Sequence, residues 1–562
     1  MSFNLHLIVE FSQIALLLVV AAGFGIVARA LKQPLLVGYL FAGLILSVFG
    51  MVRNVEVASG LGQIGVTLLL FLVGLEMKLT DLKSIGKVAL LTGVGQIIFT
   101  SAMGLFLARI LGFGILPSVY IALALTFSST IIGVKLLGAK NALDGLYGKI
   151  VIGFLLVQDL VAILILMFLS GMSRGDFGVV DYFAIVFKGG ALLLSVWFLS
   201  KKILPMIFEK FIALSDELLF IASIAWALGL ASLVAGPLGF TLEVGGFLAG
   251  LALSNLPEHL TIAAKTRGLR DFFLTIFFMA LGTKLVVGPV GSIFLPALGL
   301  SLFVLVAKPL IVLAMMGGLG YKKRTGFLTG LTVAQISEFS LILVAMGATL
   351  EHVDESVVAL VILVGVITMT LSTYMVGGAE KIYKLVSHLL SIFERSNTRE
   401  AALTVEREMR DHIIMVGCDR TGRALLPFLM RRAPVLVIDF NPKVFETLTA
   451  NKTPVLFGDV NEPEIMDIAK LRWARLVIST ISNGQDNLKL LELIKSKKAS
   501  IKVIMAAATR KEAIRLYEKG ADLVVVPEMI AGEYMRHILK TYGMGDKIDK
   551  IGKSHFMRLI GK

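Results

Sequence analysis

Residues 121–137 read IALALTFSSTIIGVKLL, an apolar stretch that is interrupted at its middle by Ser128, Ser129 and Thr130. Flanking residues such as Leu, Ile and Ala are typical of a membrane-spanning helix. Backbone groups freed by a break inside a bilayer must be satisfied within the protein, because no water is available there. The stretch therefore predicts a membrane helix that is unwound near the bilayer centre.

A second stretch, LTVAQISEFSLILV at 331–344, is interrupted in the same way by Gln335, Ser337 and Glu338. Broken helices at corresponding positions of two halves indicate the binding site of a transporter. The two breaks lie seven spans apart, and an odd offset predicts repeats of inverted orientation. A single Ser/Thr-rich break would also suit simple helix packing, because these hydroxyls bond to nearby backbone carbonyls.

The rest of the chain has the composition of a membrane protein followed by a soluble domain. Of the 562 residues, 56% are apolar and 17% are charged, against about 25% charged in ordinary soluble domains. The last 172 residues contain 50 of the charged residues and the first 390 contain 44. A bilayer-spanning helix needs about 20 apolar residues, and thirteen segments are candidates: 7–28, 34–50, 58–76, 88–111, 115–137, 149–170, 181–200, 218–235, 239–254, 271–288, 291–317, 326–348 and 355–377.

The loops between these segments predict the orientation, since Lys and Arg collect on the cytoplasmic side. Loops after the odd-numbered spans carry 17 Lys and Arg residues, and the opposite side carries five. We therefore expect the N-terminus outside, the C-terminal domain in the cytoplasm, and a bacterial-type plasma membrane as location. The basic loops explain the net charge of +14 without a nucleic-acid partner.

Three ionisable residues lie inside apolar spans: Asp159 in the middle of the sixth, Lys308 in the middle of the eleventh, and Glu338 in the twelfth. A charge at the bilayer centre costs at least about 2.5–3.5 kcal/mol, so such residues are paired, face water or carry a proton. One interpretation is a structural Asp159–Lys308 pair that joins two helices. The neighbouring helix breaks favour a transport site instead.

The soluble part, from His412, alternates short apolar runs with amphipathic segments. Six runs predict parallel strands of a doubly wound α/β sheet of the Rossmann type: HIIMVG, VLVID, PVLFGD, RLVIST, IKVIMAA and DLVVVP. The single cysteine, Cys418, excludes a disulfide framework and a cysteine-rich metal site, and we expect no metal cofactor.

The turn after the first run reads GCDRTG at 417–422, which is similar to a phosphate-binding fingerprint. Gly417, Arg420 and Gly422 fit that pattern, and Asp439 ends the second run, where it can bond a ribose hydroxyl. Asp419 replaces the middle glycine and adds a negative charge facing phosphates. A mononucleotide, a dinucleotide and an empty structural pocket remain alternatives.

Nearly the whole chain resembles the Kef-type monovalent cation:proton antiporters of the cation:proton antiporter-2 family, which carry a C-terminal RCK (TrkA-N) domain. The resemblance depends on segments in the family's order: PLLVGYLFAGLILS, LLLFLVGLEMKL, FSSTIIGVKLL, VQDLVAI, GGFLAGLALS, FFMALGTKL, AQISEFSLIL, FGDVNEPEIM and GADLVVVPEMIAGEYM. It implies a secondary active transporter, not an enzyme, that exchanges K⁺ or Na⁺ for H⁺ in a lipid bilayer.

The resemblance also implies roles for particular residues. Gln158 and Asp159 match the transport-site dipeptide, with Asp159 binding either the proton or the cation, and Lys308 matches the basic residue that faces it. The two breaks match crossed unwound helices. Gln158 in place of a second acid is associated with electroneutral one-for-one exchange.

The RCK domain implies regulation by a nucleotide, AMP or NAD(H), bound near the 417–422 turn, Asp439, Asp459 and Thr480. The family further implies a homodimer. The domain arrangement that we expect is a transmembrane exchanger (1–378), a helix and linker (379–409), a nucleotide-binding RCK domain (410–530), and a C-terminal helix with a basic tail (531–562).

Two other functions are compatible with parts of the sequence. An RCK domain would also suit a ligand-gated K⁺ channel, which would not need a titrating carboxylate at Asp159. A membrane oxidoreductase would need a redox partner, and the sequence has no haem ligand pair or cysteine pair for one.

Overall fold

The computed structural model describes residues 2–51, 55–76, 87–140, 142–143, 146–170, 179–208, 212, 215–286, 290–394, 409–460, 463–481, 483–497, 500–542 and 552. Contacts divide the chain into a helical unit, residues 1–143 and 147–394, and a sheet unit, residues 395–562 with 144–146. The predicted fold class, a polytopic helical domain followed by a Rossmann-like α/β domain, is confirmed.

The described part of the helical unit consists of helices. They are α1 (Ser2–Ala30), α2 (Leu35–Val48), α3 (Val55–Glu76), α5 (Lys87–Ile110), α6 (Ile115–Thr126), α7 (Thr130–Ala139), α8 (Leu146–Ser170), α9 (Val179–Phe198), α10 (Leu204–Ile207), α11 (Asp216–Ala235), α12 (Leu242–Leu253), α13 (His259–Thr283), α14 (Val290–Leu302), α15 (Lys308–Gly318), α16 (Lys323–Thr332), α17 (Glu338–Thr349), α18 (Glu355–Gly377) and α19 (Ala379–Val386). Short π or 3₁₀ turns continue α9, α13, α14 and α19, at Leu199–Ile203, Lys284–Val286, Phe303–Ala307 and Leu389–Phe393.

Within the part of the chain that the structure describes, nine helices are long and apolar enough to cross a membrane. Three shorter apolar helices, α2, α12 and α17, accompany them. A helix, or two helices in line, covers each of the thirteen predicted segments.

The bounds predicted for the tenth segment, 271–288, are wrong. Helix α13 begins at His259 and ends at Thr283. Its first half is charged, with Lys265, Arg267 and Arg270, so an apolar window detects only the second half. The charged half is helical because Ile262, Ala263 and Thr266 are buried on one face.

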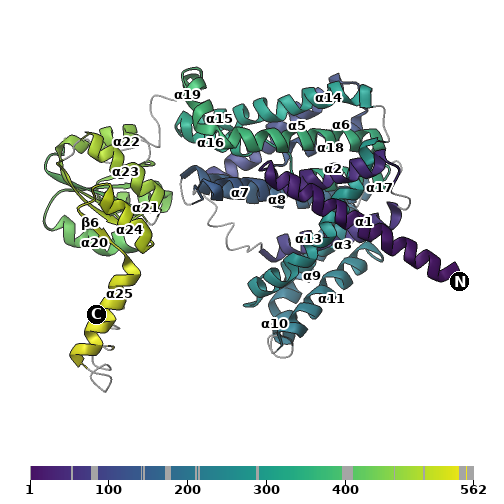
Figure 1. The fold of residues 1–562 in the computed structure, drawn as a ribbon, viewed down its shortest axis with the longest axis horizontal. Helices are drawn as coiled ribbons and strands as arrows, with labels where there is room; N and C mark the ends of the chain where they lie inside the picture. The colour runs from purple at the N-terminus through teal and green to yellow at the C-terminus, as the bar shows by residue number, and fades with distance from the viewer. Residues whose placement is uncertain are drawn as a thin grey trace. The chain divides into compact units, whose positions relative to one another are not determined.

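The helices gather into two groups that pack mainly among themselves. One group contains α1, α2, α3, α11, α12 and α13, and the other contains α5, α6 and α14 to α18. Figure 1 shows α3 beside α13, and α16 beside α15 and α18. An ion pair of 2.8 Å between Lys284 Nζ and Glu355 Oε1 joins the two groups.

Glycines allow close packing of α3 on α12, as small residues do between membrane helices. A methyl group at Gly250 would lie 1.9 Å from the carbonyl oxygen of Phe71. One at Gly74 would lie 2.2 Å from the carbonyl oxygen of Phe247. The GGFLAG segment therefore contributes backbone contact that a larger side chain would prevent.

Helix α19, which lies in the segment predicted to be a helix and linker, packs on the helical unit. Arg324 and Glu380 form an ion pair at 2.5 Å, and Lys323 and Glu394 form one at 3.6 Å. Gly317 leaves room for the carbonyl oxygen of Phe393, which a methyl group would approach to 1.9 Å. The remainder of the predicted linker, 395–408, lies outside the described residues.

The sheet unit contains six parallel strands in the order β3-β2-β1-β4-β5-β6. They are β1 (His412–Val416), β2 (Val435–Asp439), β3 (Val455–Phe457), β4 (Ala474–Ser479), β5 (Lys502–Ala506) and β6 (Leu523–Val525). The strand order reverses between β1 and β4: β2 and β3 are added on one side of β1, and β4, β5 and β6 on the other. Folds of this type bind ligands at the carboxyl ends of the strands at this point. All six predicted strands are confirmed.

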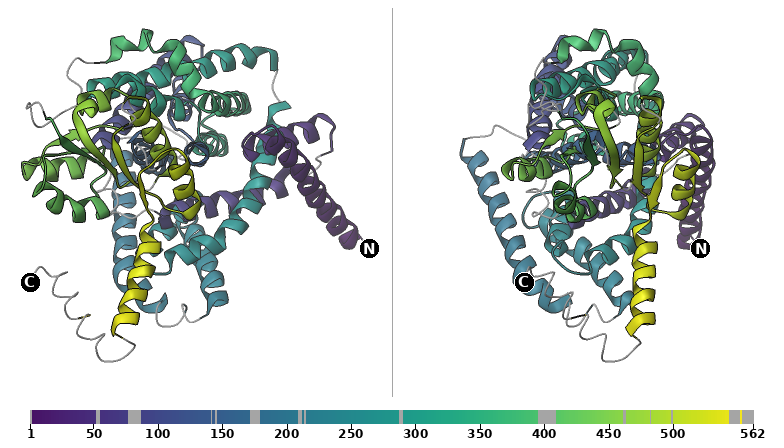
Figure 2. Two further views of the ribbon diagram at one scale, coloured as in Figure 1. Left: turned by 60° about the vertical axis from the view of Figure 1, so that its left-hand side comes forward. Right: turned by 90° about the vertical axis from the view of Figure 1, so that its left-hand side faces the viewer.

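Helices cover both faces of this sheet, namely α20 (Arg420–Met430), α21 (Pro442–Ala450), α22 (Pro463–Ile468), α23 (Gly484–Lys497) and α24 (Arg510–Glu518). Alternate residues of β1 enter two separate cores, Ile414 and Val416 in one, Ile413 and Met415 in the other. Helix α25 (Pro527–Tyr542) extends away from the sheet in both views of Figure 2, where it is yellow. The predicted basic tail after residue 542 lies outside the described residues, except for residue 552.

Candidate functional site

Both predicted helix breaks are present. Helix α6 ends at Thr126 and α7 begins at Thr130, with the Ser129 hydroxyl accepting a hydrogen bond from the Ile132 amide. Helix α16 ends at Thr332 and α17 begins at Glu338. Capping by a serine stabilises each second half-helix, because its first amides have no partner within the helix.

The two breaks contact each other. The Ser128 hydroxyl donates to the Val333 carbonyl at 3.0 Å, and the Ser340 hydroxyl donates to the Ala124 carbonyl at 2.6 Å. These partners lie 205 and 216 positions apart in the sequence. The unwound segments of the two halves thus form a single polar centre.

Lys308 is the positive charge of this centre. It is completely buried, and its ammonium donates to the carbonyls of Leu125, Phe127 and Gln335, each at 3.2 Å. These carbonyls lack helical partners because α6 and α16 end there. The ammonium therefore satisfies the carboxyl ends of two half-helices, where the helix dipole is negative.

Lys308 does not pair with Asp159. Among the ion pairs of the described residues, none joins the two side chains. The structural Asp159–Lys308 ion pair that the sequence left as one interpretation is therefore absent from the described residues, and the role of Lys308 as the basic residue that faces Asp159 stays a prediction. The Lys308 ammonium donates its hydrogen bonds to carbonyls of the breaks instead.

Asp159 lies on α8 against the start of α7. The Thr130 hydroxyl donates to Asp159 Oδ2 at 2.9 Å, and only 8% of the residue is exposed. The Glu338 carboxyl lies near enough for electrostatic repulsion when both groups are ionised. The hydroxyls of Ser129 and Ser337, one from each break, hydrogen-bond to Glu338.

The Gln158 side chain forms hydrogen bonds to the backbone of the first break. Its Oε1 accepts from the Ser128 amide at 3.1 Å, and its Nε2 donates to the Thr126 carbonyl at 3.0 Å and to Gln96 Oε1 at 2.5 Å. Both ends of the amide make hydrogen bonds, so Gln158 helps to hold the break. Gln335 likewise donates to the Thr332 carbonyl of its own break at 3.1 Å.

Sequence reasoning missed Gln96 and Ser340. Gln96 Nε2 donates to the Thr126 carbonyl at 3.1 Å and to Thr100 Oγ1 at 2.9 Å. A buried glutamine in the middle of the apolar α5 was the available signal, because polar side chains in membrane helices are costly without partners.

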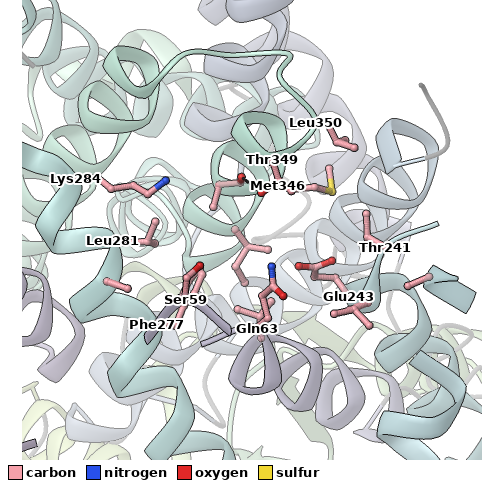
Figure 3. A pocket seen from close by; sticks show the side chains of 16 residues that line it. Ser59, Gln63, Thr241, Glu243, Phe277, Leu281, Lys284, Met346, Thr349 and Leu350 are labelled. Carbon is pink, nitrogen blue, oxygen red and sulfur yellow. Dashed lines mark hydrogen bonds between the residues drawn. The ribbon is translucent and has the colours of Figure 1, made fainter. Parts of the chain in front are cut away.

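Two cavities approach the centre from opposite ends of the helices. One, of about 370 Å³, is lined by Glu338 and Ser129 at its inner part and by Lys32, Lys135 and Arg270 from basic loops or span ends. The other, of about 260 Å³, is bounded by α3, α12, α13 and α17 and is drawn in Figure 3. Phe278 lines the first cavity, and its neighbour Phe277 lines the second.

The predicted nucleotide residues meet at the carboxyl ends of β1 to β4. Gly417 has φ +81, and a methyl group at Gly422 would lie 2.4 Å from the Gly417 carbonyl oxygen. The Thr480 hydroxyl donates to that same carbonyl at 2.8 Å. The turn thus needs glycine at both positions, one for its conformation and one for close approach.

Asp439 organises this turn from the end of β2. Its two carboxylate oxygens accept from the amides of Cys418 and Asn441, each at 2.8 Å. A cavity of about 20 Å³ beside it is also lined by Asp459 and by Asp486, which the sequence reading missed. Asp419 is exposed at the start of α20, and the side chain of Arg420 lies outside the described part.

Comparison with known proteins decides the family. Residues 14–377 match the family described as "Sodium/hydrogen exchanger, transmembrane". The chain belongs to this exchanger family. Residues 413–527 match the TrkA-N domain, so the exchanger carries such a domain after its last span, and the resemblance to Kef-type antiporters is confirmed.

Relatives of this exchanger include the putative cation/proton antiporter YbaL of Escherichia coli (strain K12). It is 28% identical over 549 residues, which are 94% of this chain and 97% of the relative. K(+) efflux antiporter 5 of Arabidopsis thaliana is 31% identical over 363 residues, 63% of each chain. The sodium proton antiporter MjNhaP1 from Methanocaldococcus jannaschii is 16% identical, covers 68% of this chain and 99% of its own, and has a TM-score of 0.51, which shows a shared fold.

The protein is therefore an integral membrane cation/proton antiporter with a C-terminal TrkA-N domain. It is a transporter and not an enzyme. Cations and protons are its substrates.

The Lys308 contacts predict how two substitutions combine. Lys308→Met should lower the apparent melting temperature in detergent, because each buried carbonyl that loses its donor costs about 1–3 kcal/mol. Asp159→Asn should change the melting temperature little, and the double variant should show the sum of both shifts. A large non-additive shift would instead indicate a direct Asp159–Lys308 pair.

Cys418 provides a test of the turn in the sheet unit. Burial, together with the nearby Asp439 carboxylate, raises the pKa of its thiol from 9.0 to about 11. The thiolate is the reactive form, so maleimide alkylation at pH 7.5 should be at least about 100-fold slower in the folded than in the denatured protein. The folded rate should rise about tenfold per pH unit up to pH 11, measured by mass spectrometry. Equal rates in both states would contradict this environment.

Proposed function

We propose that this antiporter exchanges K⁺ for H⁺ and that Asp159 carries both ions in turn. The observation that supports this most directly is the position of the Asp159 carboxylate, buried beside Thr130 where the two helix breaks meet. One carboxylate binds either a proton or a metal cation, and occupation by one excludes the other. Exchange follows if the unloaded site does not change sides.

Lys308 has a separate role in this proposal. Its charge is used by three carbonyls of the breaks, so it stabilises the unwound geometry through the whole cycle. Asp159 is then the group whose charge changes as ions bind and leave. Thr130, which donates to the empty carboxylate, can turn its oxygen towards a bound cation, because a hydroxyl is both donor and acceptor.

The choice of K⁺ is supported by the relatives that are named K(+) efflux antiporters. The exchanger family is named for sodium, so Na⁺ is the competing substrate. Gln158 carries no charge and its amide is occupied by backbone groups. With a single titrating carboxylate on this dipeptide, we expect one-for-one electroneutral exchange.

Alternating access follows from the two cavities in our proposal. The cavity with Lys32, Lys135 and Arg270 reaches Glu338 and Ser129, and Lys/Arg-rich loops mark the cytoplasmic side. We therefore assign this cavity to the cytoplasm, the second cavity and the N-terminus to the outside, and the protein to a plasma membrane of bacterial type. We also expect a homodimer in the lipid bilayer.

The TrkA-N domain is proposed to bind a regulatory nucleotide, AMP or NAD(H). Support comes from the Gly417 turn at the point where the strand order reverses, and from Asp439, Asp459 and Thr480 around it. A carboxylate oxygen has two lone pairs, so Asp439 can accept from a ribose hydroxyl while it holds the turn. Regulation further requires that the nucleotide prefers one transport state.

The transport proposal is tested by proton movement in proteoliposomes with an imposed pH gradient and a clamped membrane potential. K⁺ should dissipate the gradient in the wild type, and Asp159→Asn should abolish this, because the amide carries no titrating proton. Asp216→Asn is the matched control, since Asp216 is exposed and pairs with Lys265 at 3.3 Å on the surface.

Other results would contradict the proposal. If Na⁺ dissipates the gradient and K⁺ does not, the cation assignment is wrong. If K⁺ flows without protons and the Asp159→Asn protein conducts as well as the wild type, the protein is a channel on an antiporter scaffold.

The nucleotide proposal is tested by calorimetric titration of the full chain with AMP and with NADH. Asp439→Asn should weaken binding about tenfold, because it removes the charge that accepts from ribose. Asp467→Asn is the control, since Asp467 pairs with Lys497 on the surface. Unchanged affinity in Asp439→Asn would exclude this pocket.

A further inference from the structure

The cavity in Figure 3 contains a carboxylate that the proposed mechanism does not use. Glu243 extends into the space from the first turn of α12, and the Gln63 side chain of α3 lies beside it. Within the described part of the chain, Glu243 makes no hydrogen bond and no ion pair. It is only partly buried, so the cavity accounts for its exposure.

The other charge in this cavity is already compensated. Lys284 lies across the space from Glu243 in Figure 3, but its ammonium is 2.8 Å from Glu355. The cavity therefore has one uncompensated negative charge, and it favours a cation.

Neutral side chains with oxygen atoms line the same cavity. The Thr241 hydroxyl is buried without a hydrogen-bond partner among the described residues, and Ser59 and Gln63 line the same space. Hard cations bind oxygen ligands such as carboxylates, amide carbonyls and hydroxyls. A volume of about 260 Å³ leaves room for an ion that keeps part of its water, since each water occupies about 30 Å³ of liquid volume.

The cavity leads towards the transport site. Ile342 of α17 lines it, and Glu338, one helical turn earlier on α17, lines the opposite cavity. Phe277 and Phe278 contact each other with ring centroids 5.3 Å apart and line the two cavities separately. One turn of α17 and this phenylalanine pair therefore separate Glu243 from the polar centre.

We infer that Glu243 forms a second, outer binding site that takes up a hydrated monovalent cation on its way to or from Asp159. The inference rests on the proposed function for the direction of the ion's path. Binding at the outer cavity raises the local cation concentration next to the barrier, as acidic clefts do for cationic substrates.

A structural role for Glu243 is the alternative to exclude. An acid in the first turn of a helix also stabilises the helix dipole, and any acid on this face makes the local potential more negative. The test therefore measures potential and cation binding inside the cavity, and it compares Glu243 with Glu351, an exposed acid that follows Leu350 at the same end of α17.

Ser59→Cys places a reporter thiol in the cavity of the full-length protein in lipid vesicles. The wild-type protein controls for Cys418, which is buried. The thiol reacts with two membrane-impermeant methanethiosulfonates, one carrying a sulfonate and one a quaternary ammonium. With Glu243 present, the cationic reagent should be favoured, and replacing choline by K⁺ should reduce that preference about three- to tenfold in a saturable manner.

Glu243→Gln should remove both the preference and its response to K⁺, whereas Glu243→Asp and Glu351→Gln should retain them. In transport, Glu243→Gln should raise the half-saturating K⁺ concentration on the outer side about three- to tenfold at an unchanged maximal rate. An unchanged labelling response in Glu243→Gln, or its equal loss in Glu351→Gln, would overturn the inference.

The labelling does not depend on exchange, so the two proposals fail separately. A labelling response in a protein that moves no protons would leave the outer site standing and refute K⁺/H⁺ exchange. Exchange with no labelling response would leave the transport proposal standing and refute the outer site.

Discussion

The structure depends on how unpaired backbone groups are satisfied where no water reaches. Two helices of the membrane domain are broken near their middle, and their carbonyl ends meet. The Lys308 ammonium donates to three of these carbonyls. Gln158 and Gln96 both donate to a fourth, that of Thr126, and Gln158 also accepts from the Ser128 amide. Without such partners each buried polar group would cost several kcal/mol in hydrocarbon, and the unwound geometry would not persist.

The polar residues of the centre therefore have two kinds of role: some hold the broken backbone, and one can change its charge. Lys308, Gln158 and Gln96 hold the breaks mainly through hydrogen bonds to backbone groups. The Asp159 carboxylate, in contrast, accepts a hydrogen bond from the Thr130 hydroxyl. A site that exchanges ions needs both kinds of residue, because the scaffold must keep its shape while one group changes charge. The cavities on either side then decide from where that group is reached.

Particular residues show what sequence patterns can predict. The breaks at Ser128 and Ser337 were predictable because polar residues inside an apolar span are costly, and they are rare unless they have a structural or functional role. The strands of the sheet unit were predictable because their apolar runs are short and regularly spaced. The start of α13 was not, since its first half is charged and helical through packing on one face. The hydrogen-bond partners of Lys308 were not predictable either, because opposite charges suggest an ion pair, whereas the helix ends offer three carbonyls.

The sequence by itself determined that this protein crosses a membrane many times, where its helices break, and that a doubly wound sheet follows. These properties depend on local composition and period, which set transfer free energies and backbone preferences. Only the tertiary structure decided that Gln96 supports Gln158, that Ser340 holds the other break, and that Glu243 faces a cavity shared by α3, α13 and α17. Such contacts join residues as many as 216 positions apart, and they arise from helix packing that no local pattern records.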